Sequence, residues 1–200
     1  MQDAADAADG RFTEDDDDSY DVGLPVEPGR PAAPVLTGAP LTLHQALERL
    51  QAVMDSLDRA ADGLDELDRS GSTLIDDARD LVSEQMNDTE FSVLITFLLQ
   101  AWFALVPFGV RAPTLHFATM EAAMAAADDG LRPPGRLSRS DFERLMGGCR
   151  QPGLLQALAG GVMEGLDKLP KASRPSPPAV VSMVFVLKVV LDELDRALRA

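Results

Sequence analysis

A run of twenty residues without a charged side chain, Phe91 to Val110, constrains the fold of this 200-residue chain more than any other feature. A helix rises about 1.5 Å per residue, so the run could cross a bilayer, and its lack of charge makes it a transmembrane candidate. It could equally be the central helix of an α-helical domain, apolar nearly all round because neighbours surround it. The sequence keeps both alternatives open.

Details within the run argue against a simple span. Ser92, Thr96 and Gln100 are spaced four apart and would form a polar stripe on one face of a helix. Pro107 shortens the unbroken helix to about sixteen residues, near the lower limit for a span. We expect the large apolar side chains to contact either the core or a membrane; they are Phe91, Leu98, Trp102, Phe103 and Phe108.

Charge is distributed unevenly along the chain, which has 33 acidic and 18 basic residues and a net charge of −15. Residues 1–40 hold ten acidic residues and two arginines, and residues 41–90 hold thirteen acidic residues and four arginines. Residues 91–200 are almost neutral, with ten acidic and twelve basic residues. The asymmetry indicates that the two halves meet different surroundings. A nucleic-acid binder needs clustered basic residues, so no nucleic-acid partner is expected.

Residues 1–40 are predicted to be a disordered, acidic, proline-rich tail. Asp15 to Asp18 form an acid run, and five prolines break any helix or strand. The N-terminus lacks the basic and apolar regions of a secretory signal peptide. We therefore expect a cytoplasmic protein, with peripheral contact at the inner face of the membrane as a further expectation.

A seam of apolar residues marks the first helix, which we expect over 43–69 after a capping box formed by Thr42 and Gln45. The seam repeats at alternating spacings of four and three, which is a heptad pattern. It must be buried against another helix, either within a bundle or across a dimeric coiled coil with a partner. The candidate partner-binding residues of this seam are Leu43, Leu47, Leu50, Met54, Leu57 and Leu64.

The fold class predicted for the chain is all-α: a helical bundle of six or seven helices that follows the acidic tail. Ser140 and Glu143 match a second capping box at the start of a short helix. The predicted segments of the helical domain, 41–200, are an acidic hairpin at 41–90 (helices 43–69 and 73–87), apolar central helices at 91–127, a helical pair at 138–170, a Pro/Ser linker at 171–178 and a C-terminal helix at 179–200.

Residues that could perform chemistry are few. Cys149 is the single cysteine, and the only histidines are His44 and His116. The glycine-rich segment 160–165 is not followed by Lys-Ser/Thr, so it is no phosphate loop. The many acidic residues are expected on solvated helix faces or in the tail. We therefore predict a protein that is not an enzyme, with no catalytic residues, no cofactor and no metal site.

Two stretches carry a family resemblance. Residues Ala46 to Asp80 read as a leucine-spaced helix, a Leu-Asp-Arg-Ser-Gly turn and an acidic helix. Residues Glu121 to Lys171 contain Pro133-Pro134-Gly135 and then Gln151-Pro152-Gly153-Leu154-Leu155 before a Gly/Leu helix. Together they resemble a family of small helical proteins encoded beside formate dehydrogenase-like oxidoreductases or sulfide:quinone oxidoreductases. The resemblance implies an accessory subunit that helps a redox enzyme to assemble or to meet the membrane and its quinone.

We therefore predict a non-catalytic accessory or interaction subunit with a protein partner, and the resemblance suggests that this partner is an oxidoreductase subunit. Two alternatives stay open. One is a membrane-inserted helical protein that acts through residues 91–110. The other is an acidic scaffold protein that self-associates through the seam as a homo-oligomer.

Overall fold

The computed structural model describes residues 39–56, 60–130, 138–171 and 174–200. These residues form eight α-helices and no strand, which confirms the all-α prediction. Most of the predicted tail (residues 1–38) and Leu57 of the predicted seam lie outside the described residues. The helices are α1 (Leu43–Ser56), α2 (Ala60–Ser70), α3 (Leu74–Val82), α4 (Asp88–Leu105), α5 (Phe117–Gly130), α6 (Arg139–Gly147), α7 (Pro152–Lys168) and α8 (Pro177–Arg199).

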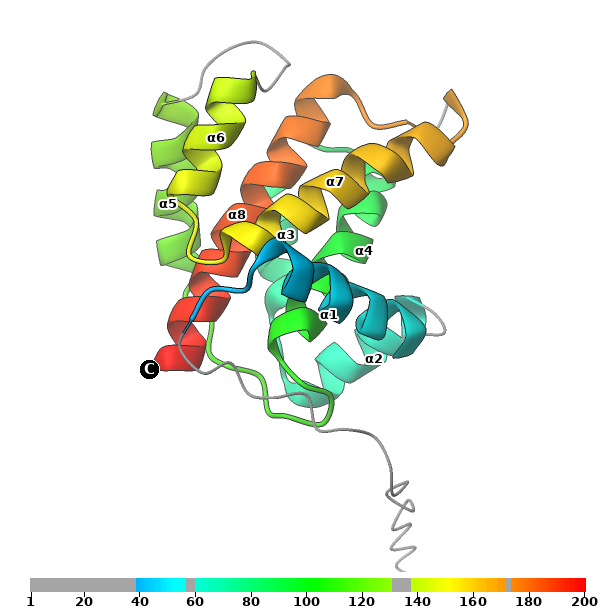
Figure 1. Cartoon of the computed structure of the whole chain (residues 1–200), viewed down its shortest axis with the longest axis vertical. Helices are drawn as coiled ribbons and strands as arrows, with labels where there is room; N and C mark the ends of the chain where they lie inside the picture. Colours follow the sequence, from blue (N-terminus) through cyan, green and yellow to red (C-terminus); the bar gives the residue numbers. More distant parts are fainter. Residues whose placement is uncertain (1–38, 57–59, 131–137, 172–173) are drawn as a thin grey trace, which may run out of the picture. The chain divides into compact units, whose positions relative to one another are not determined.

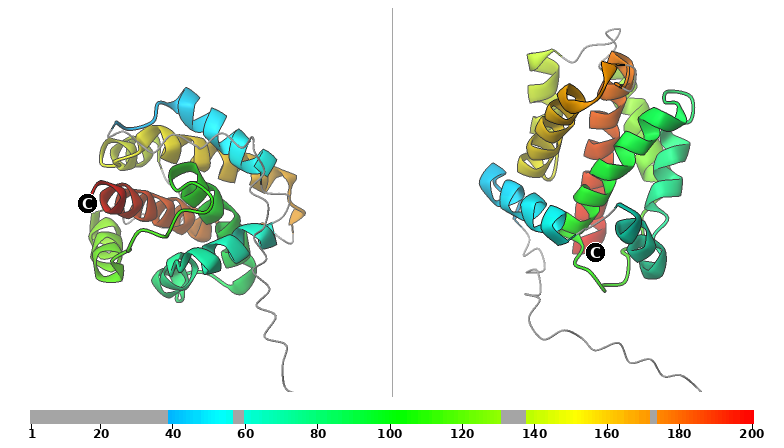
Figure 2. Two further views of the ribbon diagram at one scale, coloured as in Figure 1. Left: turned by 90° about the horizontal axis from the view of Figure 1, so that it is seen from below. Right: turned by 90° about the vertical axis from the view of Figure 1, so that its right-hand side faces the viewer.

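Helices α4 and α8 pack against each other in the middle of the bundle (Figures 1 and 2). Helices α1 and α7 contact each other and cover one side of this pair, and α6 packs on α7. Helices α2, α3 and α5 lie on the opposite side, as the left view of Figure 2 shows. The core therefore sits between two outer layers of helices.

Helix α4 begins with a capping box. The Asn87 side chain accepts a hydrogen bond from the Glu90 amide at 3.0 Å, and the Glu90 carboxylate accepts one from the Asn87 amide at 3.1 Å. The helix ends at Leu105, and Val106 is its C-cap residue just before Pro107. The predicted polar stripe faces solvent at its start, because Ser92 and Thr96 are exposed.

The large apolar residues of the 91–110 run contact the core of the bundle. Phe91, Leu98, Trp102 and Phe103 are buried, and Phe108 stacks on Phe103 with 4.2 Å between ring centroids. Helix α4 is the one helix in the described part of the chain that is long and apolar enough to cross a membrane, and 56% of it is buried inside the protein. Core contact, the first of the two alternatives for these side chains, is the one seen here.

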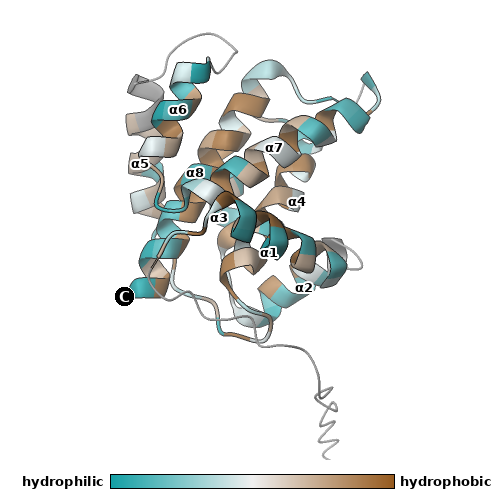
Figure 3. Ribbon diagram, in the orientation of Figure 1, coloured by the Kyte–Doolittle hydropathy of each residue, from teal (hydrophilic) through white to brown (hydrophobic). Residues whose placement is uncertain are grey.

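Helix α8 begins at Ser176, whose hydroxyl accepts from the Ala179 amide, and Pro177 occupies its first position. The Glu90 carboxylate also accepts from the Ser176 amide at 2.8 Å, so one carboxylate joins the starts of α4 and α8. Figure 3 shows that the first half of α8 is mostly apolar and that its last turns are mostly polar. The apolar half supplies much of the core.

The first predicted helix is two helices, α1 and α2, rather than one over 43–69. Helix α1 packs on α7 and α4, and α2 packs on α4. Helix α3 is shorter than the helix predicted over 73–87. The Arg49 guanidinium donates to the carbonyl of Ala104 at 2.9 Å and ties α1 to the last turn of α4. Helices α1 and α2 both contact α4, but the largest interface of α1 is with α7 and that of α2 is with α4, so one straight helix does not serve both.

Candidate functional site

The structure divides the predicted seam. Leu50 is buried and Leu64 is half-buried, whereas Leu43, Leu47 and Met54 are 38%, 51% and 56% exposed. We call Leu43, Leu47 and Met54 the α1 stripe. The bundle therefore does not bury the whole seam, because these three residues are exposed. That they are buried against a partner stays a prediction.

Helix α1 has two apolar faces, and the fold uses one of them. Its buried residues are Ala46, Leu50 and Val53, spaced four and three apart. At about 100° per residue, the α1 stripe lies about 70° further round the helix axis. The stripe is therefore a second apolar face at the border between the core and solvent.

Gly153 sets the position of α1 on α7. A Cβ atom at Gly153 would lie 2.3 Å from the carbonyl oxygen of Leu41 and 2.8 Å from the amide nitrogen of Leu43. Only glycine allows the backbone before α1 to come this close to α7. The Leu41 amide also donates to the buried side chain of Gln151 at 2.9 Å. The start of α1 is thus fixed to the start of α7.

A groove of about 1200 Å³ lies beside the α1 stripe and crosses the exposed side of α7, reaching α6 and α8. Figure 1 shows these four helices, with α7 crossing α8 between α1 and α6. Most of its lining is apolar, and one further lining residue, Met163, is 59% exposed. The apolar residues that line the groove include Leu43, Leu47, Leu50, Met54, Phe142, Ala157, Met163, Val180, Val181 and Val184.

The charged side chains that line the groove balance one another. They are two arginines, Arg139 and Arg174, and two acidic residues, Glu164 and Asp167. Each has a partner within the protein: Glu164 accepts from Lys168 at 2.8 Å and Arg139 donates to Glu143 at 2.9 Å. Arg174 lies 3.9 Å from Asp167. The groove is thus a neutral surface on an acidic protein.

Gly160 forms a low point in the wall of this groove. A Cβ atom at Gly160 would meet nothing within 4 Å, so the fold does not require glycine there. A glycine inside a helix lowers stability by about 0.5–1 kcal/mol relative to alanine. At the next glycine, Gly161, a Cβ atom would lie 3.4 Å from the Phe97 ring, which is van der Waals contact, so there is less room there than at Gly160.

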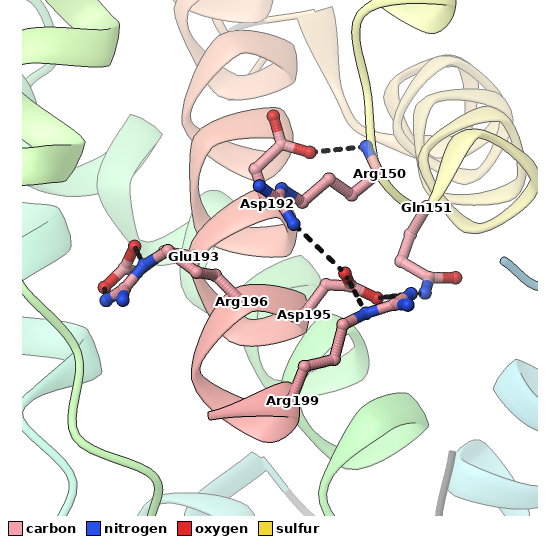
Figure 4. Close-up of polar contacts among 7 residues, drawn as sticks. All are labelled: Arg150, Gln151, Asp192, Glu193, Asp195, Arg196 and Arg199. Carbon is pink, nitrogen blue, oxygen red and sulfur yellow. Dashed lines mark hydrogen bonds and ion pairs between the residues drawn. The ribbon is translucent and has the colours of Figure 1, made fainter. Parts of the chain in front are cut away.

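Three carboxylates near the end of α8 accept hydrogen bonds from residues that are distant in the sequence (Figure 4). The sequence analysis did not predict these contacts. The Asp192 carboxylate accepts from the Arg150 amide at 2.6 Å, and the Glu193 carboxylate accepts from the His116 amide at 2.8 Å. The Asp195 carboxylate accepts from the Gln151 side chain at 2.6 Å. We call these three residues the α8 clamp.

The prediction that acidic residues lie on solvated faces is wrong for two members of the α8 clamp. Glu193 is 3% exposed and Asp195 is 2% exposed. Arg196 donates to Glu193 at 2.8 Å, and Arg199 donates to Asp195 at 2.7 Å. These Arg–carboxylate pairs look like ordinary surface pairs in the sequence, and the amide groups that also donate to the two carboxylates lie far away along the chain.

Acid is expected to weaken the fold partly through Glu193. The hydrogen bond from Arg196 lowers the pKa of Glu193 most, against the effect of burial, and the His116 amide lowers it further. A carboxyl group with a lowered folded pKa adds stability above its unfolded pKa of about 4.3, and this stability is lost as the pH falls through the folded pKa. We expect the free energy of unfolding of Glu193→Gln, measured with urea, to fall less steeply below about pH 4.3 than that of the wild type. Glu84→Gln, on an exposed residue, is the control, and an unchanged slope in Glu193→Gln would contradict the prediction.

The residues considered for chemistry are Cys149, His44 and His116. The Cys149 thiol is half-buried, and burial together with the nearby Asp192 carboxylate raises its pKa to about 12. Arg150, the next residue in the sequence, therefore does not make the thiol reactive. His44 and His116 are exposed. Within the described ranges, no group of three or more His, Cys, Asp or Glu side chains could hold a metal ion.

Comparison with known proteins adds no relative. No protein-family model, curated protein or solved structure matches the chain. The groove and the α1 stripe are therefore the features on which a function can be argued. An apolar, neutral groove can bury apolar surface of another molecule and can position it.

Proposed function

We propose that the protein is a non-catalytic interaction subunit that binds a helix of another protein molecule in the groove. The observation that carries the proposal is the α1 stripe: three large apolar side chains, each more than one third exposed, on one wall of an apolar groove. Single exposed apolar residues are normal on a protein surface, whereas a contiguous apolar patch is typical of contact sites.

The walls of the groove favour a helix over a small molecule. Small-molecule sites enclose most of the surface of their ligand. Leu47, Met54 and Met163 are each more than half exposed, so a small molecule lying against them would stay largely in water. A helix is about 10 Å wide and presents apolar residues at the same spacings as the stripe. It could cover all three side chains at once.

The family resemblance extends this proposal to the wider assembly. It suggests that the protein serves an oxidoreductase in the cytoplasm or at the inner face of the membrane. Helices α2 and α3 hold seven acidic residues and two arginines, which makes them a surface for contacts of a different kind from those in the groove. Contact with the oxidoreductase need not use the groove.

Photo-crosslinking tests whether the α1 stripe binds another protein molecule. The photoreactive amino acid p-benzoylphenylalanine replaces Leu47 in the full chain, expressed in its native host, and ultraviolet light is applied to living cells. We expect a covalent adduct of one defined mass. The matched control carries the same group at Val110, which is 45% exposed and does not line the groove. Equal adduct yields at the two positions would refute the proposal.

Membrane insertion through residues 91–110 is the second candidate, favoured by the length and composition of α4. It requires the core contacts of Trp102 and Phe103 to be exchanged for lipid. Alkaline extraction of membranes distinguishes the two candidates, because an inserted helix resists it and a docked subunit is released. We expect the protein in the soluble or the released fraction.

A further inference from the structure

We infer that the occupant of the groove is a second copy of this chain, with the α1 stripe of each copy packed against that of the other in a twofold dimer. The inference rests on the proposed function, since it names the molecule that the groove binds. Three properties of the described residues support it: the spacing of the stripe, the charge around it and the glycine in the groove wall.

The spacing of the stripe suits self-association. The stripe residues Leu43, Leu47 and Met54, together with the buried Leu50 between them, follow at four, three and four residues, which are the a and d positions of a heptad repeat. In a twofold dimer the same patch of both copies forms the interface, so each stripe residue meets apolar residues of the other copy. Helix α1 is about 21 Å long at 14 residues, enough for two heptads of contact.

The charge around the stripe argues against a partner selected by its charge. In coiled coils, charged residues beside the a and d positions set partner choice. In α1 the e positions are His44 and Gln51, which are not acidic or basic residues of the kind that select a partner. The g positions are Ala46 and Val53, which are buried in the core.

The balance of charge inside the groove points the same way. The four charged side chains lining the groove sum to zero in a chain with a net charge of −15. A basic helix would be attracted to the acidic helices α2 and α3 rather than to this surface. Two copies of this acidic chain would therefore repel each other less at the groove than at α2 and α3.

Gly160 leaves room for the occupant to bring a backbone or a large side chain close to α7. Glycine permits close approach to the helix surface, and its Cβ position is open in the single chain. Leu50, which lies between Leu47 and Met54 on the wall, is already buried. A second α1 helix would bury the exposed parts of the wall and leave Leu50 in the core of its own chain.

Sedimentation velocity over about a hundredfold range of concentration tests the dimer. We expect the wild-type chain, 21.4 kDa, to reach twice this mass as its concentration rises. The double variant Leu47→Asp/Met54→Asp is expected to weaken the dimer at least about a hundredfold, because each carboxylate would have to be desolvated. Gly160→Leu, which adds no charge, is expected to weaken it by filling the groove.

The control for these variants is Val110→Asp, which changes an exposed apolar residue outside the groove and should keep the wild-type dimer. The substituted residues are exposed or meet open space, so all variants should keep the helical circular dichroism spectrum of the wild type. A wild-type chain that stays monomeric throughout, or a dimer that the groove variants leave unchanged, would overturn the inference.

Disulfide crosslinking at the stripe checks the geometry. We expect Leu47→Cys, or a mixture of Leu43→Cys and Met54→Cys chains, to form a crosslinked dimer under mild oxidation. The native Cys149 makes the wild-type chain the background control, because the raised pKa of its thiol slows disulfide formation. Absence of any crosslink at all three stripe positions would count against the inference.

The photo-crosslinking result separates this inference from the proposed function. An adduct composed of two copies of the chain supports both. An adduct with an oxidoreductase subunit or another protein supports the proposed function and overturns the second-copy inference. Equal yields at positions 47 and 110 overturn both.

Discussion

Replacing Gly153 by alanine is expected to destabilise the protein by about 3 kcal/mol, because the new methyl group has no room. Its position lies 2.3 Å from the Leu41 carbonyl oxygen, 2.7 Å from the Thr42 carbonyl carbon and 2.8 Å from the Leu43 amide nitrogen. All three are backbone atoms, so no side-chain rotation relieves the overlap. The start of α1 would have to move away from α7, and the bond between the Leu41 amide and Gln151 would weaken.

The matched control is the same substitution at Gly160, seven residues later in the same helix. Its methyl group would meet nothing within 4 Å, and alanine favours helix over glycine by about 0.5–1 kcal/mol. We therefore expect Gly160→Ala to stabilise the protein by this amount in urea denaturation. Hydrogen exchange should show faster amide exchange in α1 for Gly153→Ala alone. Similar effects of the two substitutions would show that the close approach at Gly153 does not control the docking of α1.

Most of the helices could be predicted from the sequence because their signals are local, although the one expected over 43–69 is two helices. The Thr42–Gln45 box forms as expected, with the Gln45 amide donating to the Thr42 hydroxyl at 3.3 Å. The second box was predicted at Ser140 and Glu143, but the structure uses Ser138 and Asp141, two residues earlier. Both pairs satisfy the same serine-to-acid spacing, so the pattern alone does not choose between them.

The choice of the buried face of α1 could not be made from the sequence. The heptad seam and the face formed by Ala46, Leu50 and Val53 are both apolar, and they share Leu50. The face that turns inward depends on the close approach at Gly153, 110 residues after Leu43. A heptad pattern in a single sequence predicts that a helix face is buried, but it does not identify the helix or the molecule that covers this face.

The burial of the α8 clamp was hidden from the sequence for a related reason. Glu193 with Arg196 and Asp195 with Arg199 have the three- and four-residue spacings of surface ion pairs on a helix. What makes Glu193 a structural group is the His116 amide, 77 residues away. Long-range partners of this kind leave no trace in local spacing.

Replacing Asp195 by alanine is expected to lower the free energy of unfolding by about 1–3 kcal/mol, the usual loss when a buried polar group is left without its hydrogen-bond partner. The carboxylate is 2% exposed and accepts from the Gln151 side chain at 2.6 Å and from Arg199 at 2.7 and 2.8 Å. Its loss would leave the fully buried Gln151 amide group without its acceptor. Arg199 is partly exposed and could turn to solvent.

A double-mutant cycle with Gln151→Ala, followed by urea denaturation, tests whether Asp195 acts through this link. Gln151 joins Asp195 to the Leu41 amide, so it connects the end of α8 to the start of α1. We expect the double variant to lose clearly less stability than the sum of the two single variants, since both remove the same connection. Asp167→Ala is the control, because its carboxylate is 85% exposed and its contact with Arg174 is a surface pair expected to contribute less than about 1 kcal/mol. Additive losses from Asp195 and Gln151 would mean that the α8 clamp holds α8 alone and does not couple it to α1.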